Sequence, residues 1–214
     1  MNTAVVLVEE RGTKLENITR GDFPKAFLPI NRKPLIERTI ETLNSVGIKR
    51  IILITGHLKE FFELLNKKYE GIETIPNLNY SNTGSMGSFY CAKDSIKDEE
   101  EVLLLDGDLI YEKNALEILI NSQNEDAILL DEDEKPVGIQ KLSNSLFEEM
   151  FEAYKNSDNL KLDYESLIFE IGKNRNISHE KAKDILWSKI DTQDDFKNVV
   201  ETIYPAIIEK EKAL

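Results

Sequence analysis

Four short apolar runs, separated by stretches with helical spacing, limit the fold of this chain more than any other feature of its sequence. Each run has the length of a buried strand, and the four are Ala4–Val8, Arg50–Thr55, Val102–Leu105 and Ala127–Leu130. The segments between the first three runs, and the segment after the third, have the periodicity of helices. Because alternating strands and helices favour a mostly parallel sheet with helices packed on it, the sequence predicts an α/β fold.

The helix predicted between the first two runs is the best defined. Pro34 suits the first turn of a helix, and Gly47 ends the pattern. The apolar residues between them recur at helical spacing and are Leu35, Ile36, Ile40, Leu43 and Val46. A second helix is predicted over Lys59–Tyr69, and Ser85 is a candidate cap for a third.

The alternation weakens after Leu130, where the predicted elements are shorter. They are a strand over Val137–Ile139, helices over Leu146–Tyr154 and Leu160–Gly172, a short helix beginning near His179, a strand over Asp184–Ile190, and a C-terminal helix that starts with a capping-box-like pattern at Thr192 and Asp195. The acidic run Asp131–Glu134 is predicted to be a solvated turn. The sequence has no repeat and no linker, so the expected organisation is one domain over residues 1–214.

Charge and composition narrow the range of partners. The chain has 27 basic and 40 acidic residues, and its formal charge of −13 would repel nucleic acid. No apolar run approaches the roughly 20 residues that span a bilayer, and no signal segment is recognisable, so we expect no membrane insertion and a cytoplasmic location. The single cysteine, Cys91, excludes an internal disulfide and a thiolate zinc site, and it is expected to pack in the core.

Two carboxylates directly follow the third apolar run. Asp106 and Asp108 flank Gly107 at the end of Val102–Leu105, and open α/β sheets gather their ligands at the carboxyl ends of strands. Carboxylate oxygens at that place suit Mg²⁺ and a polyphosphate, and the position favours this interpretation over a plain Asp-Gly turn. A further carboxylate, Asp191, follows the last predicted strand; read alone, it belongs to the helix cap.

Two polar loops are candidates for holding a nucleotide. The first follows the opening strand and contains Gly12, Lys14 and Lys25, which could offer backbone N–H groups and cations to a triphosphate. By composition alone this is a structural loop. The second, Asn79–Gly87, offers amides, hydroxyls and flexible backbone just before a helix. It suits the reading of a base or ribose, and a polar turn with a helix cap is an equal alternative.

These separate patterns occur in the order found in one family. Along nearly its whole length, the chain resembles the nucleoside-triphosphate transferases related to sugar nucleotidyltransferases, and most closely the CTP:2-aminoethylphosphonate and CTP:phosphocholine cytidylyltransferases. The segments that carry the resemblance are the opening strand and loop, Pro24–Phe27, Lys33–Glu37, Thr55–His57, Asn79–Gly87, Leu105–Tyr111, Lys161–Glu165 and Ile190–Asp191. The resemblance implies a three-layer α/β/α, Rossmann-like fold with a mostly parallel, mixed sheet of the sugar-nucleotidyltransferase type.

The resemblance also implies a reaction in which a phosphonate or phosphate oxygen attacks the α-phosphorus of CTP and pyrophosphate leaves. On the matching positions, Asp108 and Asp191 would hold Mg²⁺, and Lys25 would balance charge on the phosphates. Gly12 and Lys14 would contact the triphosphate. The residues that would line the cytidine pocket are Asn82, Thr83, Gly84, Ser85 and Met86. Those that would bind a cationic acceptor head group, through charge and an aromatic face, are Asp163, Tyr164 and Glu165.

The chain departs from the family at two places. Where the family has Leu-Ala-Ala-Gly-x-Gly-x-Arg, Leu7–Lys14 reads Leu-Val-Glu-Glu-Arg-Gly-Thr-Lys, so Glu10 replaces a glycine and Lys14 an arginine. Between Leu130 and Val137 the family usually has more strand and a hairpin. Two alternatives therefore stay: a degenerate homologue that only binds a partner, and a transferase for another nucleotide or a sugar phosphate. A homodimer is also left open.

Overall fold

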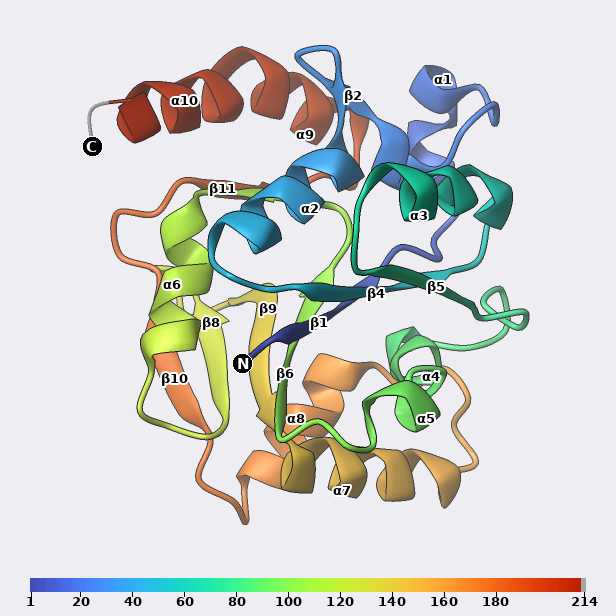
Figure 1. Cartoon of the computed structure of the whole chain (residues 1–214), viewed down its shortest axis with the longest axis vertical. Helices are drawn as coiled ribbons and strands as arrows, with labels where there is room; N and C mark the ends of the chain where they lie inside the picture. The colour runs from blue at the N-terminus through green and yellow to red at the C-terminus, as the bar shows by residue number, and fades with distance from the viewer. Residues whose placement is uncertain (213–214) are drawn as a thin grey trace.

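The computed structural model describes residues 1–212, and its centre is a seven-stranded mixed sheet (Figure 1). The strands are β1 (Thr3–Leu7), β4 (Arg50–Thr55), β5 (Ile72–Pro76), β6 (Glu101–Asp106), β8 (Ala127–Leu130), β9 (Pro136–Ser143) and β10 (Ser178–Lys181). Their order across the sheet is β10-β8-β9-β6-β1-β4-β5. Of these seven strands β9 alone is reversed, because it pairs antiparallel with both β6 and β8 while the other pairs are parallel.

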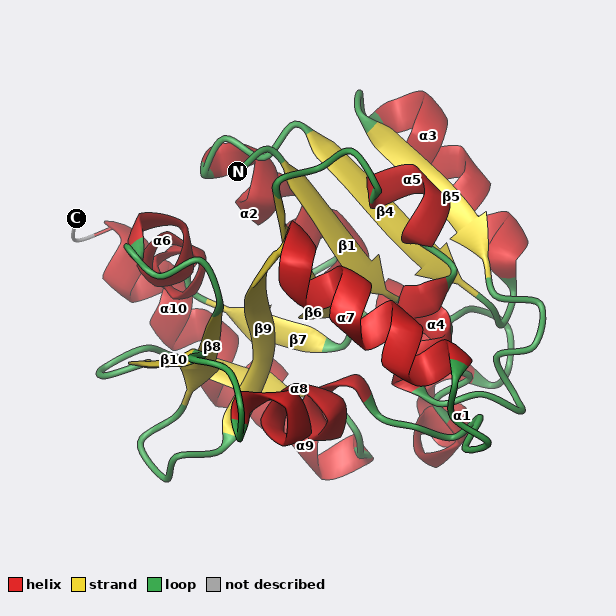
Figure 2. Ribbon diagram, turned by 90° about the horizontal axis from the view of Figure 1, so that it is seen from below, coloured by secondary structure: helices red, strands yellow, loops and turns green. Residues whose placement is uncertain are grey.

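Helices cover both faces of the sheet, which confirms the predicted three-layer α/β/α fold (Figures 1 and 2). One face carries α2 (Leu35–Ser45), the 3₁₀ helix η3 (Lys59–Leu64) with α3 (Leu65–Lys68), and α6 (Lys113–Asn121). The other carries α4 (Ser85–Tyr90), α5 (Lys93–Ile96), α7 (Asn144–Lys155) and α8 (Tyr164–Gly172). Within β1, Ala4 and Val6 pack toward the first group, and Val5 and Leu7 toward the second. Burial on both faces is why β1 is a continuous apolar run.

A third, smaller core joins the N-terminal loops to the C-terminal helices. Its buried apolar residues are Leu15, Leu28, Ile30, Leu35, Ile110, Ile190, Val199 and Ile207. The elements around it are η1 (Thr13–Leu15), α1 (Glu16–Thr19), η2 (Lys25–Phe27), β2 (Pro29–Ile30), β3 (Lys33–Pro34), α9 (Gln193–Asn198), the π-helical turn η4 (Val199–Ile203) and α10 (Tyr204–Lys212). The chain enters this region through β11 (Trp187–Lys189), which pairs antiparallel with β7 (Leu109–Tyr111) outside the main sheet. This pairing brings the segment around residue 190 beside the end of β6.

Most of the predicted elements are confirmed. The four apolar runs are β1, β4, β6 and β8, and the capping box at Thr192 and Asp195 begins α9. The acidic run is a tight turn between β8 and β9, and β9 extends beyond the predicted Val137–Ile139. α8 begins at Tyr164 rather than at Leu160, because the Asp163 side chain caps it.

Five strands were not predicted from the sequence, and they are β2, β3, β5, β7 and β10. β2 and β3 have only two residues each. β5 and β10 lie at the two edges of the sheet, where fewer side chains are buried, so neither has a continuous apolar run. β10 stands where the pattern predicted a short helix near His179, and that prediction is wrong. β7 has only three residues, too few for a recognisable period. The predicted strand Asp184–Ile190 exists in part as β11, but it pairs with β7 instead of joining the main sheet.

α7 has 12 residues, and α9, η4 and α10 follow one another without a break over residues 193–212. Within residues 1–212, no helix has both the length and the apolar character that crossing a bilayer requires.

Candidate active site

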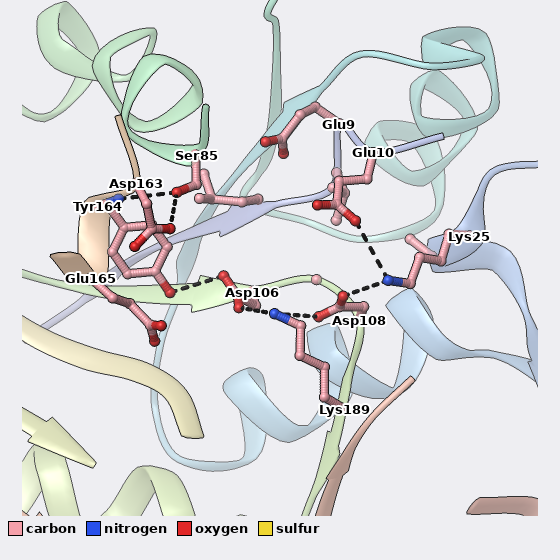
Figure 3. Close-up of a pocket in the computed structure, with 14 residues that line it drawn as sticks. Glu9, Glu10, Lys25, Ser85, Asp106, Asp108, Asp163, Tyr164, Glu165 and Lys189 are labelled. Carbon is pink, nitrogen blue, oxygen red and sulfur yellow. Dashed lines mark hydrogen bonds and ion pairs between the residues drawn. The ribbon is translucent and has the colours of Figure 1, made fainter. Parts of the chain in front are cut away.

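A cleft with two parts lies at the carboxyl ends of β1 and β6. Its first part, here called the loop part, is lined by residues 9–14, Lys25, Tyr80, Ser81, Thr83, Gly84, Ser85 and Asp191. Its second part, the carboxylate part, is lined mainly by Asp106, Asp108, Asp163, Tyr164, Glu165 and Lys189 (Figure 3). Glu9, Glu10, Lys25 and Ser85 line both parts, so the two are continuous.

Main-chain packing places the two aspartates that follow β6. Asp106 is the last residue of β6 and lies opposite Leu7 of β1, and the Gly107 N–H donates to the Leu7 carbonyl at 2.8 Å. A Cβ on Gly107 would lie 2.5 Å from that carbonyl oxygen and 2.3 Å from Val8 Cγ1. Glycine therefore allows the close turn that directs both carboxylates into the cleft.

The Lys25 ammonium joins the two aspartates that were predicted to meet. Its Nζ donates to Asp108 Oδ2 at 2.6 Å, and Glu10 Oε2 lies 3.5 Å away (Figure 3). The same Nζ donates to Asp191 Oδ1 at 2.8 Å. Burial alone would lower the pKa of Lys25, but the Asp108 and Asp191 carboxylates outweigh it and the pKa is raised. Burial likewise opposes ionisation of Asp191, and the Lys25 hydrogen bond reverses this, so the pKa of Asp191 is lowered. Lys25 and Asp191 are therefore charged at neutral pH.

The same carboxylates have the chemistry of a divalent-cation site. One oxygen each from Glu10, Asp108 and Asp191 lie within 4.8 Å of one another. Asp108 Oδ1 is buried and has no hydrogen-bond partner among the described residues. A buried carboxylate oxygen without a donor is unfavourable, and a hard cation such as Mg²⁺ would satisfy it. The donor set therefore fits Mg²⁺.

A second lysine lies in the carboxylate part. Lys189 Nζ donates to Asp106 Oδ2 at 2.8 Å and lies 4.0 Å from Asp108 Oδ1. The Tyr164 hydroxyl donates to the other oxygen of Asp106 at 2.9 Å. Burial alone would lower the pKa of Lys189, but Asp106 and Asp108 outweigh it and raise the pKa. Asp106 is thus held between a cation and a phenol, and Lys189 stays positive in the cleft.

The structure gives different positions to the three residues predicted to bind a cationic head group. Asp163 caps α8, since its Oδ1 accepts the Ser166 N–H at 2.8 Å, and its Oδ2 accepts the Ser85 hydroxyl at 2.8 Å. The Tyr164 side chain is only 1% exposed, so the predicted aromatic face for an ammonium is wrong: the ring packs in the core and only the hydroxyl faces the cleft. Glu165 keeps a free oxygen, and its other oxygen accepts from Gln140 at 3.0 Å.

The ionisation of Glu165 is set by its surroundings. Burial raises its pKa to about 7, and the nearby Asp106 and Asp163 carboxylates act in the same direction, whereas Lys189 and the Gln140 hydrogen bond oppose them. Near neutral pH this carboxyl is therefore divided between its neutral and charged forms.

The loop predicted to line a cytidine pocket does so in part. Thr83, Gly84 and Ser85 line the loop part of the cleft, together with Tyr80 and Ser81. Asn82 instead donates to the Asn79 side chain at 2.8 Å within its own turn. Met86 is fully buried in the core below α4, so its predicted place in the pocket is wrong for the side chain. An apolar side chain in the first turn of an amphipathic helix is directed toward the sheet, not toward solvent.

Gly12 and Lys14 lie where the first loop was predicted to contact a ligand. Both line the loop part with Asp191. Gly12 has φ +65°, a conformation that favours glycine, and a Cβ there would lie 2.9 Å from Lys25 Cβ. The glycine therefore lets the loop pack against the stem of Lys25 and helps fix its ammonium.

Lys189 and Glu9 were given no binding role from the sequence, and Asp106 was given a different one. Lys189 stands two positions before Asp191, so an extended strand directs both to the same side, and this spacing was the available signal. Asp106 was predicted beside Asp108 as a carboxylate suited to Mg²⁺, but in the structure its two oxygens accept from Lys189 and Tyr164. Glu9 is buried, accepts the Ser88 hydroxyl at 2.5 Å, and has a pKa raised to about 7 by burial. Nothing in the local sequence of Glu9 indicates that burial.

Comparison with known proteins agrees with this geometry. A model of the MobA-like NTP transferase domain matches residues 4–166. A relative named CTP:phosphoglutamine cytidylyltransferase, from Campylobacter jejuni, is 27% identical over 83% of this chain and 68% of its own length. A choline-phosphate cytidylyltransferase from Streptococcus pneumoniae is 37% identical over 52% of this chain, and a 2-aminoethylphosphonate cytidylyltransferase from Lancefieldella rimae 28% identical over 50%. Those two matches span less than half of the relatives' own lengths, 46% and 43%.

Solved structures show that the fold is shared. The CTP:phosphocholine cytidylyltransferase LicC from Streptococcus pneumoniae has a TM-score of 0.80 and 24% identity, with 94% of this chain and 99% of that chain covered. The inositol-1-phosphate CTP transferase from T. maritima has a TM-score of 0.80 and 18% identity, with 98% and 97% covered. The family model spans most of the sheet and the whole loop part except Asp191. This chain belongs to the MobA-like NTP transferase domain family, which confirms its predicted kinship with nucleotidyltransferases.

Proposed function

We propose that the chain is a Mg²⁺-dependent cytidylyltransferase that joins CMP from CTP to a small phosphate or phosphonate compound and releases pyrophosphate. The observation that carries the proposal is the convergence of Asp108 and Asp191, from separate ends of the sequence, on one cation position beside Lys25. The names of the relatives, which concern choline phosphate, 2-aminoethylphosphonate and phosphoglutamine, support CTP as donor and a phosphoryl group as acceptor.

In the proposed reaction, an ionised oxygen of the acceptor forms a bond to the α-phosphorus of CTP. The bond from that phosphorus to the oxygen bridging it to the β-phosphorus breaks, and pyrophosphate leaves with the bonding electrons. No proton has to move, so the protein's part is to position the reactants and balance their charge. Mg²⁺ held by Asp108 and Asp191 would polarise the α-phosphate.

The loop part would receive the nucleotide. The backbone around Gly12 and the ammonium of Lys14 would face the triphosphate, and Thr83, Gly84 and Ser85 would line the side that takes the nucleoside. Lys25, which lines both parts, would face the phosphates where the two reactants meet. A fixed ammonium at that point would stabilise the charge that develops on the α-phosphate during transfer.

The carboxylate part would receive the acceptor. Lys189 has donors left beyond its bond to Asp106, and it would bind a phosphate or phosphonate oxygen. Glu165 has a free oxygen and would bind an ammonium group at the other end of the same molecule. A cation and a carboxylate facing the same space favour a zwitterion, and 2-aminoethylphosphonate and phosphocholine are both of this kind.

The test is pyrophosphate release from CTP and Mg²⁺ with either acceptor. We expect release with the wild-type protein and a loss of at least about a hundredfold in Asp108→Ala, because one cation ligand and one Lys25 partner disappear together. Glu63→Ala, which changes an exposed carboxylate of η3, is the matched control and should retain the wild-type rate.

Two outcomes would change the conclusion. Turnover that is faster with UTP, GTP or ATP than with CTP would keep the transferase and replace the base. No release with any nucleotide and either acceptor would leave a non-catalytic binding protein. This is the alternative suggested by Glu10, which stands where the family has a glycine.

A further inference from the structure

We propose that Glu10 is a third carboxylate ligand of the divalent cation, so that this chain binds the cation before nucleotide arrives. In the absence of the cation, the Lys25 ammonium occupies its position. The inference rests on the proposed function, because the cation is the one that the transfer would use. It goes further in assigning Glu10 a role and in predicting a competition between Lys25 and the metal.

The first support is the convergence of three carboxylates on a single positive charge. Asp108, Asp191 and Glu10 lie 2.6, 2.8 and 3.5 Å from Lys25 Nζ, and three of their oxygens lie within 4.8 Å of one another. An ammonium surrounded by carboxylates occupies the position that a metal ion with the same ligands would take. The contact to Glu10 is the longest of the three, so Glu10 interacts with the lysine most weakly.

The second support is the buried oxygen of Asp108 that the lysine leaves unsatisfied. Asp108 is 8% exposed, and its Oδ1 has no hydrogen-bond partner within residues 1–212. Lys189 Nζ lies 4.0 Å away, beyond hydrogen-bond distance. One ammonium with a limited set of donors satisfies only part of this cluster, whereas a divalent cation accepts oxygen ligands from several directions.

The Glu10 side chain is free to adjust its position and coordinate a cation. It lies in the loop after β1, its side chain is 69% exposed, and Lys25 is its one side-chain partner within the described chain. By contrast, Asp191 is tied by its backbone to Asp195 and Asp108 is buried. The two aspartates are thus a fixed pair of ligands, and Glu10 is an adjustable third one.

Charge favours exchange of the lysine for a divalent ion. Three carboxylates around one ammonium leave a net charge of about −2 at the cluster, and the chain as a whole is also acidic, at −13. Mg²⁺ sites with one or two carboxylates usually need substrate phosphates to complete the coordination of the ion. A third carboxylate would let the protein bind the ion in the absence of nucleotide. When the cation enters, the Lys25 ammonium loses its position between the carboxylates and becomes available to the phosphates of a nucleotide that binds afterwards.

The test is a titration of the nucleotide-free protein with Mn²⁺, in which free Mn²⁺ is read by electron paramagnetic resonance. We expect Glu10→Gln to weaken binding by about tenfold, because a charged ligand is lost, and Lys25→Met to tighten binding several-fold, because the competing ammonium is lost. Asp108→Asn should abolish this site. Glu63→Gln, which replaces an exposed carboxylate on η3, is the matched control and should bind Mn²⁺ as the wild type does.

Wild-type affinity in Glu10→Gln, or weaker binding in Lys25→Met, would overturn the inference, provided that circular dichroism shows folded variants. Wild-type affinity in Asp108→Asn would overturn it as well, because the ion would then be bound elsewhere. Pyrophosphate release is measured separately. An inactive wild type would remove the proposed function while the Mn²⁺ titration still decides the site, and an active enzyme indifferent to Glu10 would remove only the inference.

Discussion

At the scale of single residues, the cleft is organised by two lysines that share four carboxylates. Lys25 contacts Asp108 and Asp191 and lies near Glu10, and Lys189 contacts Asp106. Each ammonium is held charged by its neighbours, so neither is suited to act as a base. Their common effect is positive charge in the cleft of a protein whose overall charge is −13, and in the proposed function that charge would attract phosphoryl groups.

Glu165 gives a prediction about pH. Its pKa is raised to about 7, so below that value the empty cleft holds a neutral carboxyl that must lose its proton to pair with an ammonium. We therefore expect kcat/KM for phosphocholine to rise by about tenfold between pH 6 and pH 8, as the ionised fraction of Glu165 grows. The quaternary ammonium of phosphocholine does not titrate, which makes it the suitable substrate.

Glu165→Gln separates this effect from ionisation of the acceptor's own phosphate. The variant should have a lower kcat/KM for phosphocholine, an unchanged KM for CTP, and only the pH dependence that belongs to the phosphate. If the variant kept the full wild-type rise, Glu165 would not be the group that binds the ammonium.

The sequence predicts a site residue only where the neighbouring residues indicate its position in the fold. Asp108 follows a buried apolar strand, whose carboxyl end lies at the edge where such sheets bind ligands, so its place in the cleft was predictable from the sequence. Asp191 follows β11, a polar strand outside the main sheet, and only the family resemblance predicted that it meets Asp108. The family resemblance placed Met86 and Tyr164 in the binding pockets, but their burial depends on how α4 and α8 pack against the sheet. A single sequence does not contain that packing.

At the scale of elements, the start of α8 links the two parts of the cleft. Asp163 caps this helix through Ser166 and also accepts the Ser85 hydroxyl from the start of α4, while Ser85 accepts the Tyr164 N–H at 3.0 Å. One carboxylate therefore ties the loop part to the helix that carries Tyr164 and Glu165. Both of its oxygens accept hydrogen bonds from these serines, and its predicted contact with a head group stays a prediction.

Asp163→Ala should lower the free energy of unfolding by about 1–2 kcal/mol, since a helix cap and a link between two helices are lost. For a chain of this size that corresponds to a fall in Tm of about 2–8 °C, measurable by thermal unfolding followed by circular dichroism. Asp163→Asn retains a capping oxygen and should lose less. Equal Tm values for wild type and Asp163→Ala would show that the cap contributes nothing.

Elements differed in how clearly the sequence marked them. β1, β4 and β6 lie in the middle of the sheet and are buried on both faces, so each is an unbroken apolar run. β10 is a short, polar edge strand that has only β8 as a neighbour, and its sequence, Ser-His-Glu-Lys, has no strand pattern at all. Pairing with β8, a tertiary effect, decides its conformation.

At the scale of the whole molecule, ligand binding should increase the free energy of unfolding. The nucleotide and the cation are both proposed to bind the folded protein across loops and strands from several parts of the chain. A ligand at about 100 times its Kd stabilises the folded state by about 2.7 kcal/mol. We expect CTP with Mg²⁺ to raise Tm by about 5–10 °C.

The measurement is thermal unfolding with CTP and Mg²⁺ together, with CTP and a chelator, and with Mg²⁺ alone. CTP with a chelator should give a smaller shift than the pair, because the carboxylates around Lys25 would then repel the triphosphate. Asp108→Asn should remove the part of the shift that depends on Mg²⁺. An equal shift with and without chelator would contradict a metal-bridged nucleotide.

The pairing of β11 with β7 has a consequence for when the cleft becomes competent. Lys189 and Asp191 are added to the growing chain only after every strand of the main sheet has been made, because β10 ends at Lys181. On the ribosome, a nascent polypeptide can therefore assemble the sheet and expose Asp108 and Lys25 without their later partners. The cluster of Lys25, Asp108 and Asp191 is therefore complete only after residue 191 has been added and β11 has paired with β7.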